Sequence, residues 1–280
     1  MLPNRATCAT FALALSIVSA LPAGDPGLLP RDNATQIGFI DVSVATLWTN
    51  PQKPRLVDAP ALTNPAQVEE WLDTMTVDQY RDLTSNSRTQ TQALYGAQVY
   101  ILDETDGWYE VAVPGQLTPK NELGYPGWVP KAQVSLDASY GTLQSGRPFV
   151  LVDKTATTGL YRDVFMKEKV MDITYDTRLP VISRLGRAVQ VAVPSGGSAY
   201  VSARDTSVYY SESDIPYPTK EDLVADAKLF LGRPYLWGGT SGFAFDCSGF
   251  THTLYHAHGI TFGRDADAQA DCTNHATKVD

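Results

Sequence analysis

Short apolar stretches that alternate with polar residues fill the middle of the chain. Residues 93–115, ALYGAQVYILDETDGWYEVAVPG, contain two such stretches with Asp106-Gly107 between them. Runs rich in Val, Ile, Tyr and Trp that are separated by glycine-containing turns are typical of β-hairpins. A further strand pattern follows at 122–134, ELGYPGWVPKAQV. The pattern therefore predicts the strand-turn-strand meander of a small β-barrel.

A similar pattern recurs later, over residues 179–209. The tetrapeptide Val-Ala-Val-Pro stands at 111–114 and again at 191–194, and each copy is followed by glycines and a short strand with an aromatic residue and a valine. This period of about 80 residues is too long for a solenoid repeat. Two small barrels in series are the architecture that it predicts.

The region before the first barrel has a mixed pattern. Residues 37–48, IGFIDVSVATLW, alternate well enough to predict one strand. Four prolines in residues 49–65 predict that this stretch has no regular structure. The apolar positions of residues 68–83 then follow helical spacing, which predicts one or two short helices after Pro65.

Helical patterns return after the second barrel. Thr219 has the character of an N-cap, with Asp222 three positions later, and Gly232 ends this helix. A second helix is predicted to open near Cys247 and to stop at Gly259. Its apolar positions form one stripe: Phe250, Leu254 and Ala257. The predicted fold class is therefore α+β, with two small β-barrels and then a helical segment.

The N-terminus has the features of a secretory signal peptide over residues 1–20. Arg5 supplies the positive charge, residues 11–18 supply an apolar run, and Val18-Ser19-Ala20 is a small-residue cleavage site. The apolar run is too short to span a bilayer. We therefore expect a secreted protein, in which residues 21–36, rich in Pro, Gly and polar residues, form a linker.

Charge excludes one class of partner. Without the signal peptide the chain has 21 basic and 31 acidic residues, a net charge of −10. Proteins that bind nucleic acid need clustered Lys and Arg, so we expect no nucleic-acid partner. No later segment is long and apolar enough to cross a membrane, so we expect no membrane partner either.

Cys247 is the candidate for covalent chemistry. It follows Asp246, a plausible N-cap, and unpaired N–H groups at a helix start favour the thiolate form of a cysteine. Gly249 keeps the turn slim, which leaves room for a substrate backbone. Two alternatives stay open: a disulfide with Cys272, since Cys8 leaves with the signal peptide, and a buried cysteine that acts as a small hydrophobe.

Three histidines follow Cys247, but helix geometry excludes them as its base. At about 100° and 1.5 Å per residue, His252 and His256 lie roughly 140° and 180° around the helix from Cys247. His258 returns to the same face about 16 Å further along the axis. A hydrogen bond needs about 3 Å, so the base comes from His275 or from outside the chain. For all four histidines we expect ordinary surface or edge positions.

Residues 235–265, YLWGGTSGFAFDCSGFTHTLYHAHGITFGRD, resemble the nucleophile segment of the NlpC-type, papain-like cysteine peptidases. Within that family the segment is most similar to the bacterial γ-D-glutamyl-L-diamino acid endopeptidases, also called dipeptidyl-peptidase VI. The resemblance covers roughly 37–280. It implies a first SH3-like barrel with a helical insertion over 37–136, a second barrel over 146–212 and a peptidase domain over 217–280.

The resemblance also implies roles for single residues. Cys247 matches the nucleophile, and Tyr235 matches the tyrosine whose hydroxyl, with the backbone N–H of the cysteine, stabilises the oxyanion. The substrate-binding residues that it implies are Asp246, Ser248, Tyr125 and Trp237. Asp246 and Ser248 would bind the free N-terminal L-Ala and its neighbour, and Tyr125 would close the non-primed end of the cleft. For Trp237, core packing is an equal alternative.

The chain departs from the family pattern at three points. Ala266 stands where the family has a serine, and Gln90 stands, by a less secure match, where a glutamate helps to bind the amine. A neutral amide binds an ammonium less strongly than a carboxylate does. The catalytic histidine of the family follows the cysteine helix on later strands. We therefore expect an incomplete peptidase domain, which is inactive as a chain of 280 residues.

The leading expectation is thus a cysteine endopeptidase. It would cut the γ-D-glutamyl–diamino acid bond of peptidoglycan-derived peptides with a free N-terminal L-Ala. A protein that binds cell-wall peptides without cutting them is the main alternative, and an amidase or acyltransferase on the same fold is a weaker one. The His and Cys residues lack the spacing of metal ligands, so we expect no metal and no cofactor. We expect a monomer.

Overall fold

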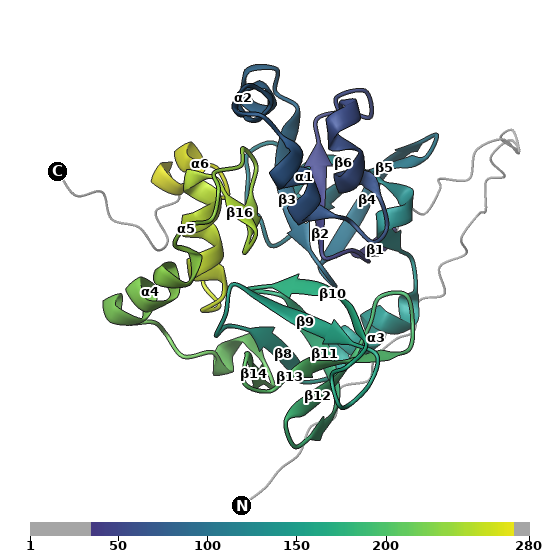
Figure 1. The fold of residues 1–280 in the computed structure, drawn as a ribbon, viewed down its shortest axis with the longest axis vertical. Helices are drawn as coiled ribbons and strands as arrows, with labels where there is room; N and C mark the ends of the chain where they lie inside the picture. The colour runs from purple at the N-terminus through teal and green to yellow at the C-terminus, as the bar shows by residue number, and fades with distance from the viewer. Residues whose placement is uncertain (1–34, 272–280) are drawn as a thin grey trace, which may run out of the picture. The chain divides into compact units, whose positions relative to one another are not determined.

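The computed structural model describes residues 35–271, which form two seven-stranded antiparallel β-sheets and a following segment of short helices and one two-stranded hairpin (Figure 1). This arrangement confirms the predicted α+β fold class. The predicted signal peptide, Cys272 and His275 lie outside the described residues. Within 35–271, no helix has the length and apolar character needed to cross a membrane.

The first β domain is a seven-stranded sheet in the order β3-β2-β6-β5-β4-β1-β7. The predicted turn at Asp106-Gly107 joins two of its strands, and Gly107 has the positive φ, +75°, that such a turn favours. Aliphatic side chains such as Val99, Val111 and Val129 form the core of this domain. The strands are β1 (Ile37–Ile40), β2 (Val44–Trp48), β3 (Thr89–Leu94), β4 (Gln98–Thr105), β5 (Trp108–Val113), β6 (Tyr125–Pro130) and β7 (Val134–Ser135).

The expected single strand over 37–48 is wrong, because the chain bends at 41–43 and forms β1 and β2 separately. β1 pairs with β4 and β7, whereas β2 pairs with β3 and β6, so the chain crosses from one part of the sheet to another. β2 is buried on both faces: Ala45 and Leu47 enter the sheet core, and Val44 and Trp48 pack against helices.

The composition of the proline-rich stretch 49–65 predicts no regular structure, and this prediction is wrong for part of the stretch. It contains a 3₁₀ helix, η1 (Leu56–Leu62), with Pro60 inside it. The carboxylate of Asp58 holds this turn: it accepts hydrogen bonds from the backbone and guanidinium of Arg55 and from Trp71 Nε1. A short 3₁₀ turn needs few backbone donors, so the missing N–H of proline is tolerated there.

The helical pattern at 68–83 is confirmed as two helices, α1 (Val68–Thr74) and α2 (Val77–Ser85). Thr76 divides them, because its hydroxyl caps α2 by accepting the N–H of Gln79. Both helices belong to the insertion between β2 and β3. Their apolar side chains belong to a cluster that also contains residues of the C-terminal segment.

The second β domain repeats the seven-stranded arrangement, in the order β10-β9-β13-β12-β11-β8-β14. A short helix, α3 (Ala138–Gly146), precedes it. Its core contains Val150, Leu160, Ile173, Val191 and Val201. The strands are β8 (Phe149–Val152), β9 (Thr157–Tyr161), β10 (Lys169–Thr174), β11 (Arg178–Leu185), β12 (Ala188–Ala192), β13 (Ser198–Ser202) and β14 (Thr206–Tyr209).

The C-terminal segment begins with the helix predicted at Thr219. The Thr219 hydroxyl and the Asp222 carboxylate form the expected capping box at the start of α4 (Lys220–Ala227). The predicted second helix is α5 (Cys247–His256), and its apolar stripe is confirmed. The remaining elements are short: η2 (Lys131–Gln133), η3 (Glu212–Asp214), η4 (Lys228–Phe230), β15 (Thr240–Ser241), β16 (Ala244–Phe245) and α6 (Ala266–Asp271).

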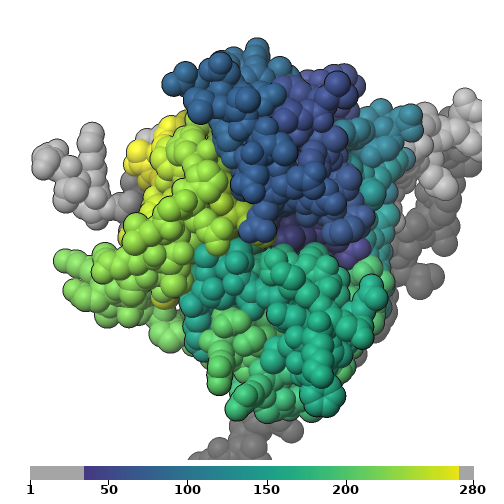
Figure 2. Space-filling view, in the orientation of Figure 1, coloured from purple at the N-terminus to yellow at the C-terminus, as the bar shows by residue number. Residues whose placement is uncertain are grey.

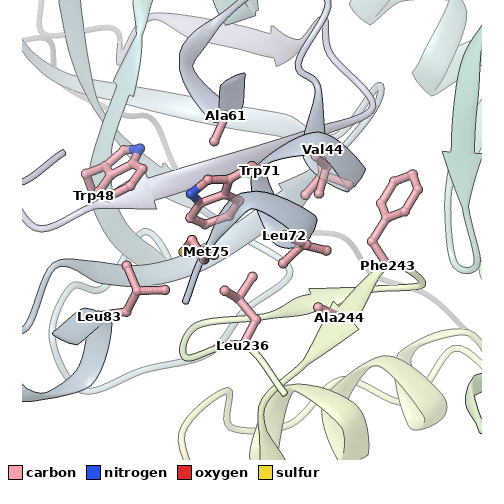
Figure 3. Close-up of a cluster of buried hydrophobic side chains, with 11 residues drawn as sticks. Val44, Trp48, Ala61, Trp71, Leu72, Met75, Leu83, Leu236, Phe243 and Ala244 are labelled. Atoms are coloured by element: carbon pink, nitrogen blue, oxygen red, sulfur yellow. The ribbon is translucent and has the colours of Figure 1, made fainter. Parts of the chain in front are cut away.

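Two apolar clusters fix this segment between the β domains, and Figure 2 shows it in contact with both on one face. In the first cluster, Leu236 and Ala244 pack with Trp71 and Leu72 of α1 and with other apolar residues (Figure 3). In the second, Leu254 of α5 packs with aromatic and aliphatic residues of the second domain and of η4, among them Tyr175 and Phe230. The C-terminal segment is therefore held from two sides.

Candidate functional site

Cys247 is the first residue of α5, and its thiol is unpaired and exposed. Its exposure contradicts the alternative of a buried cysteine. Asp246 is the N-cap, as predicted: its carboxylate accepts the N–H of Gly249 at 2.6 Å and that of Gly238 at 2.9 Å. The backbone that presents the thiol is thus fixed on both sides of the cap.

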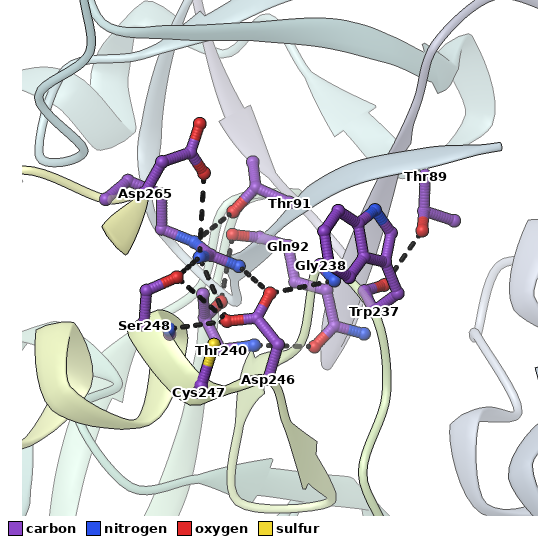
Figure 4. Close-up of polar contacts among 12 residues, drawn as sticks. Thr89, Thr91, Gln92, Trp237, Gly238, Thr240, Asp246, Cys247, Ser248 and Asp265 are labelled. Carbon is purple, nitrogen blue, oxygen red and sulfur yellow. Dashed lines mark hydrogen bonds and ion pairs between the residues drawn. The ribbon is translucent and has the colours of Figure 1, made fainter. Parts of the chain in front are cut away.

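A buried arginine that the sequence did not single out connects this cap to the first β domain. Arg264 is 1% exposed. Its Nη1 and Nη2 donate to the two carboxylate oxygens of Asp246 at 3.1 and 2.8 Å, and Nη1 also donates to Ser248 Oγ at 3.0 Å. Its Nε donates to Thr91 Oγ1 of β3 at 3.0 Å. Thr91, Asp246, Cys247 and Ser248 therefore gather at the start of α5 (Figure 4).

The glycine two positions after Cys247 serves packing rather than substrate access. A Cβ on Gly249 would lie 2.0 Å from the carbonyl oxygen of Gly239. The space that a side chain at position 249 would occupy is therefore filled by the backbone of Gly239. Our interpretation that this glycine leaves room for a substrate backbone is wrong for that reason.

Tyr235 precedes the hairpin of β15 and β16 and is 56% exposed. It pairs with Phe245 through a parallel bridge, which brings it beside the cap of α5. Desolvation by burial, and then the neighbouring Cys247 and Asp246, raise the pKa of the Tyr235 phenol. A phenol with a raised pKa keeps its proton at neutral pH, so Tyr235 is available there as a hydrogen-bond donor.

A pocket of ≈ 450 Å³ opens at Cys247. Its walls come from the first β domain and from the C-terminal segment, and the predicted residues Tyr125, Trp237, Asp246, Cys247 and Ser248 all line it. The backbone of Trp237 is tied to the first domain, because its carbonyl accepts the hydroxyl of Thr89 at 2.8 Å. The indole is 39% exposed, so it does not belong to a closed core.

Tyr125 ends one side of this pocket, where it contacts residues that the sequence did not identify as site residues. Its hydroxyl donates to the carboxylate of Asp265 at 2.8 Å and also contacts the ammonium of Lys120. Burial, and then the charge of Asp265, raise the pKa of the Tyr125 phenol, which therefore stays protonated. Gln90 and Ala266, two of the three departures from the family pattern, also line the pocket.

None of the three described histidines is hydrogen-bonded to Cys247. His256 Nδ1 pairs with Asp176 at 2.6 Å, and His258 Nε2 pairs with Asp226 at 2.9 Å. The expected surface position is wrong for His252, which is 4% exposed. Burial, and then the neighbouring His256 and Arg264, lower the pKa of His252 to about 3. His252 is therefore neutral in the folded protein.

Among residues 35–271, no cluster of three or more His, Cys, Asp or Glu side chains could hold a metal ion. What the described site offers is a thiol, two protonated phenols and a group of charged side chains. An accessible thiol beside hydrogen-bond donors can carry out acyl transfer, provided that a base takes its proton.

The C-terminal segment and both β domains match known families. Residues 232–280 match the NlpC/P60 family, residues 80–134 match the family described as bacterial dipeptidyl-peptidase Sh3 domain, and residues 154–209 match the family described as YKFC SH3b2 domain. Both predicted barrels are thus SH3-like.

Two bacterial relatives of this chain carry the name gamma-D-glutamyl-L-lysine dipeptidyl-peptidase. The protein from Bacillus cereus is 45% identical over 232 residues, which are 83% of this chain and 69% of the relative. The protein from Bacillus subtilis is 35% identical over 228 residues, 81% of this chain and 73% of the relative. The crystal structure of an NlpC/P60 family protein from B. cereus is similar, with a TM-score of 0.79 and 45% identity over 83% of this chain and 76% of that one.

Proposed function

The chain belongs to the NlpC/P60 peptidase family, and from this premise we propose that it is a secreted cysteine endopeptidase for peptidoglycan-derived peptides. In the proposed reaction, the enzyme hydrolyses the bond between γ-D-glutamate and a diamino acid in peptides that begin with a free L-Ala. The names of the two dipeptidyl-peptidase relatives support this bond as the one that is cut. The signal-like residues 1–20 support secretion.

One observation carries the proposal: Cys247 is exposed at the start of α5 and lines a pocket of ≈ 450 Å³. In the proposed mechanism its thiolate attacks the carbonyl carbon of the γ-glutamyl group. The oxygen that becomes negative accepts hydrogen bonds from the backbone N–H of Cys247 and from the phenol of Tyr235. The C–N bond then breaks, the amine leaves with a proton, and water hydrolyses the thioester.

This reaction needs an imidazole that takes the thiol proton and gives a proton to the leaving amine. Within residues 35–271 the histidines have their partners elsewhere, or are buried and neutral. His275 lies outside the described residues. The imidazole that the proposed reaction needs therefore comes from outside residues 35–271.

The test is hydrolysis of L-Ala-γ-D-Glu-L-Lys, and of the corresponding peptide with meso-diaminopimelate, by the protein as its gene expresses it. Release of L-Ala-D-Glu, abolished by Cys247→Ala and retained in the matched variant Cys272→Ala, is the expected result. A polypeptide of the 280 residues alone, with and without His275→Ala, is assayed beside it. Without dipeptide release by the expressed protein, the peptidase proposal is wrong.

A second candidate function is binding of cell-wall peptides without cleavage. The observation that favours it is the absence of a histidine beside Cys247 among the described residues. Sedimentation with purified peptidoglycan, together with calorimetry on soluble peptides, distinguishes the two functions. A protein that only binds gives saturable binding and no product after prolonged incubation.

A further inference from the structure

Lys120 lies in the pocket of Cys247, in the loop between β5 and β6. Its ammonium contacts three acceptors: a carboxylate oxygen of Asp265 at 3.0 Å, Gln90 Oε1 at 3.3 Å and the hydroxyl oxygen of Tyr125. It also lies 4.2 Å from the centroid of the Tyr125 ring, within range of a cation–π contact. A primary ammonium thus has every kind of contact here that a substrate ammonium would need.

The loop that carries Lys120 is anchored on both sides. Leu117 pairs with Gly263, and its carbonyl accepts the N–H of Arg264 at 2.9 Å. At the other end Gly124 has φ +127°, and a Cβ there would lie 2.2 Å from the carbonyl oxygen of Val113. The loop therefore returns tightly to β6, and the position of Lys120 beside the pocket follows from the fold.

The charges of the pocket explain what Lys120 does there. Asp246 is already paired with the buried guanidinium of Arg264. Asp265 lies 4.0 Å from that guanidinium and forms a closer ion pair, at 3.0 Å, with Lys120. A peptide ammonium that approaches Tyr125 and Asp265 therefore meets acceptors that a lysine of the protein already occupies. The third acceptor, Gln90, is neutral and does not offset this competition.

We propose that Lys120 is a specificity-determining residue: its ammonium competes with the N-terminal ammonium of the peptide for Asp265, Tyr125 and Gln90. This inference rests on the proposed function for the identity of the peptide. The Lys120 side chain is 42% exposed, so it can move into solvent when a peptide binds. Binding of a free amine then carries the cost of breaking the Lys120 contacts, and the preference for free N-termini is weakened.

The test measures dissociation constants by calorimetry in the Cys247→Ala background, which prevents turnover. The two ligands are L-Ala-γ-D-Glu-L-Lys and the same peptide with an acetylated N-terminus. Lys120→Met keeps the length of the side chain and removes its charge. A partly exposed ion pair is worth at most about 1 kcal/mol, so we expect Lys120→Met to bind the free peptide about two- to fivefold more tightly. Its affinity for the acetylated peptide is expected to stay unchanged.

Lys131 provides the matched control. It too belongs to the first β domain, pairs with a carboxylate, Glu104 at 3.0 Å, and lies 4.9 Å from the ring centroid of a tyrosine, Tyr109. It does not line the pocket at Cys247. Lys131→Met makes the same charge change on the same domain, and it is expected to leave both dissociation constants unchanged.

Each other outcome has a definite meaning. Weaker binding of both peptides by Lys120→Met would mean that Lys120 binds a carboxylate of the peptide, and the inference would be overturned. If the expressed protein cleaves the peptide but Lys120→Met leaves the ratio of the two dissociation constants unchanged, the inference on Lys120 is overturned and the peptidase proposal stands. If the expressed protein does not cleave but Lys120→Met gains affinity for the free peptide only, the peptidase proposal fails and the role of Lys120 stands. If the expressed protein does not cleave the peptide, and neither the Cys247→Ala protein nor its Lys120→Met variant binds either peptide, the peptidase proposal and the inference on Lys120 both fail.

Discussion

At the scale of single residues, the guanidinium of Arg264 organises the site more than any group with a proposed catalytic role. It contacts the N-cap Asp246, the hydroxyl of Ser248 and the β3 residue Thr91. A guanidinium presents five N–H donors in a rigid planar fork that matches a carboxylate bidentately, whereas an ammonium is a compact charge with three donors. The pocket residues therefore depend on one buried cation for their alignment.

We expect Arg264→Lys to destabilise the protein by about 3 kcal/mol, because it leaves a buried carboxylate with too few donors. Chemical denaturation measures the loss, and peptide affinity is expected to fall with it. The matched control is Arg81→Lys, at an exposed ion pair with Asp78 in which Arg81 is 77% exposed. That change is expected to stay within about 0.5 kcal/mol. Equal stability of the two variants would contradict the proposed role of Arg264.

How much of the site can be predicted depends on whether a contact is local in sequence. The placement of Cys247 after Asp246 is predictable, because the cap is adjacent to its helix and accepts an N–H only three residues later, as general rules of capping require. The contacts of Arg264 with Thr91 and of Lys120 with Asp265 span more than a hundred residues. Nothing in the local pattern distinguishes these two cations from exposed ones.

At the scale of elements, the helices and hairpins of this chain follow their local signals, and the exceptions have tertiary causes. The capping box at Thr219 and the turn at Asp106-Gly107 form as predicted. The bend at 41–43 and the 3₁₀ helix η1 do not follow from the pattern, because they depend on distant partners such as Gln133 and Trp71. Strand alternation also fails in β2, which is buried on both faces.

The contact between α4 and the end of α5 gives a pH-dependent prediction. A hydrogen bond to Asp226, and then the charge of that carboxylate, raise the pKa of His258. Tyr175 donates to the same carboxylate at 2.8 Å, and Asp222 adds a further negative charge nearby. A raised pKa means that the folded state holds the proton more tightly. The stabilisation is therefore complete below the unfolded pKa of about 6.5 and is lost as pH rises through the folded pKa.

We expect the free energy of unfolding to fall by roughly 0.5–1 kcal/mol more in the wild type than in His258→Gln between pH 5.5 and pH 8.5. Denaturant titrations at both pH values measure this difference. His252 acts in the opposite direction, because its pKa is lowered, but both proteins contain it and its effect cancels. Parallel pH profiles for the two proteins would show that the contact of His258 with Asp226 contributes no charge-dependent stability.

At the scale of the whole molecule, the site is assembled from parts that are distant in sequence. The segment that carries Cys247 shares one apolar cluster with α1 and β2 and another with the second β domain. The second domain contributes no residue to the pocket, but it supports the segment from the other side. We therefore expect substitutions at the contact with the second domain to change the geometry of the pocket.

Gly242, at the tip of the hairpin of β15 and β16, tests this coupling. A Cβ on Gly242 would lie 1.9 Å from the carbonyl oxygen of Ala156 in the second domain, and its φ lies outside the left-handed region. Gly242→Ala therefore adds a steric clash without backbone strain, and overpacking of this kind costs about 2 kcal/mol. The clash is relieved when the hairpin and the backbone at Ala156 move apart, which displaces the segment that carries Cys247.

We expect Gly242→Ala to lower the free energy of unfolding by that amount and to weaken peptide binding, although Gly242 does not line the pocket. Hydrogen exchange over 236–249 is expected to increase at the same time. Gly146→Ala, at the end of α3 with nothing within 4 Å of its Cβ position, is the matched control and is expected to change none of these measurements. Loss of stability with unchanged peptide affinity in Gly242→Ala would show that the second domain stabilises the chain without controlling the geometry of the site.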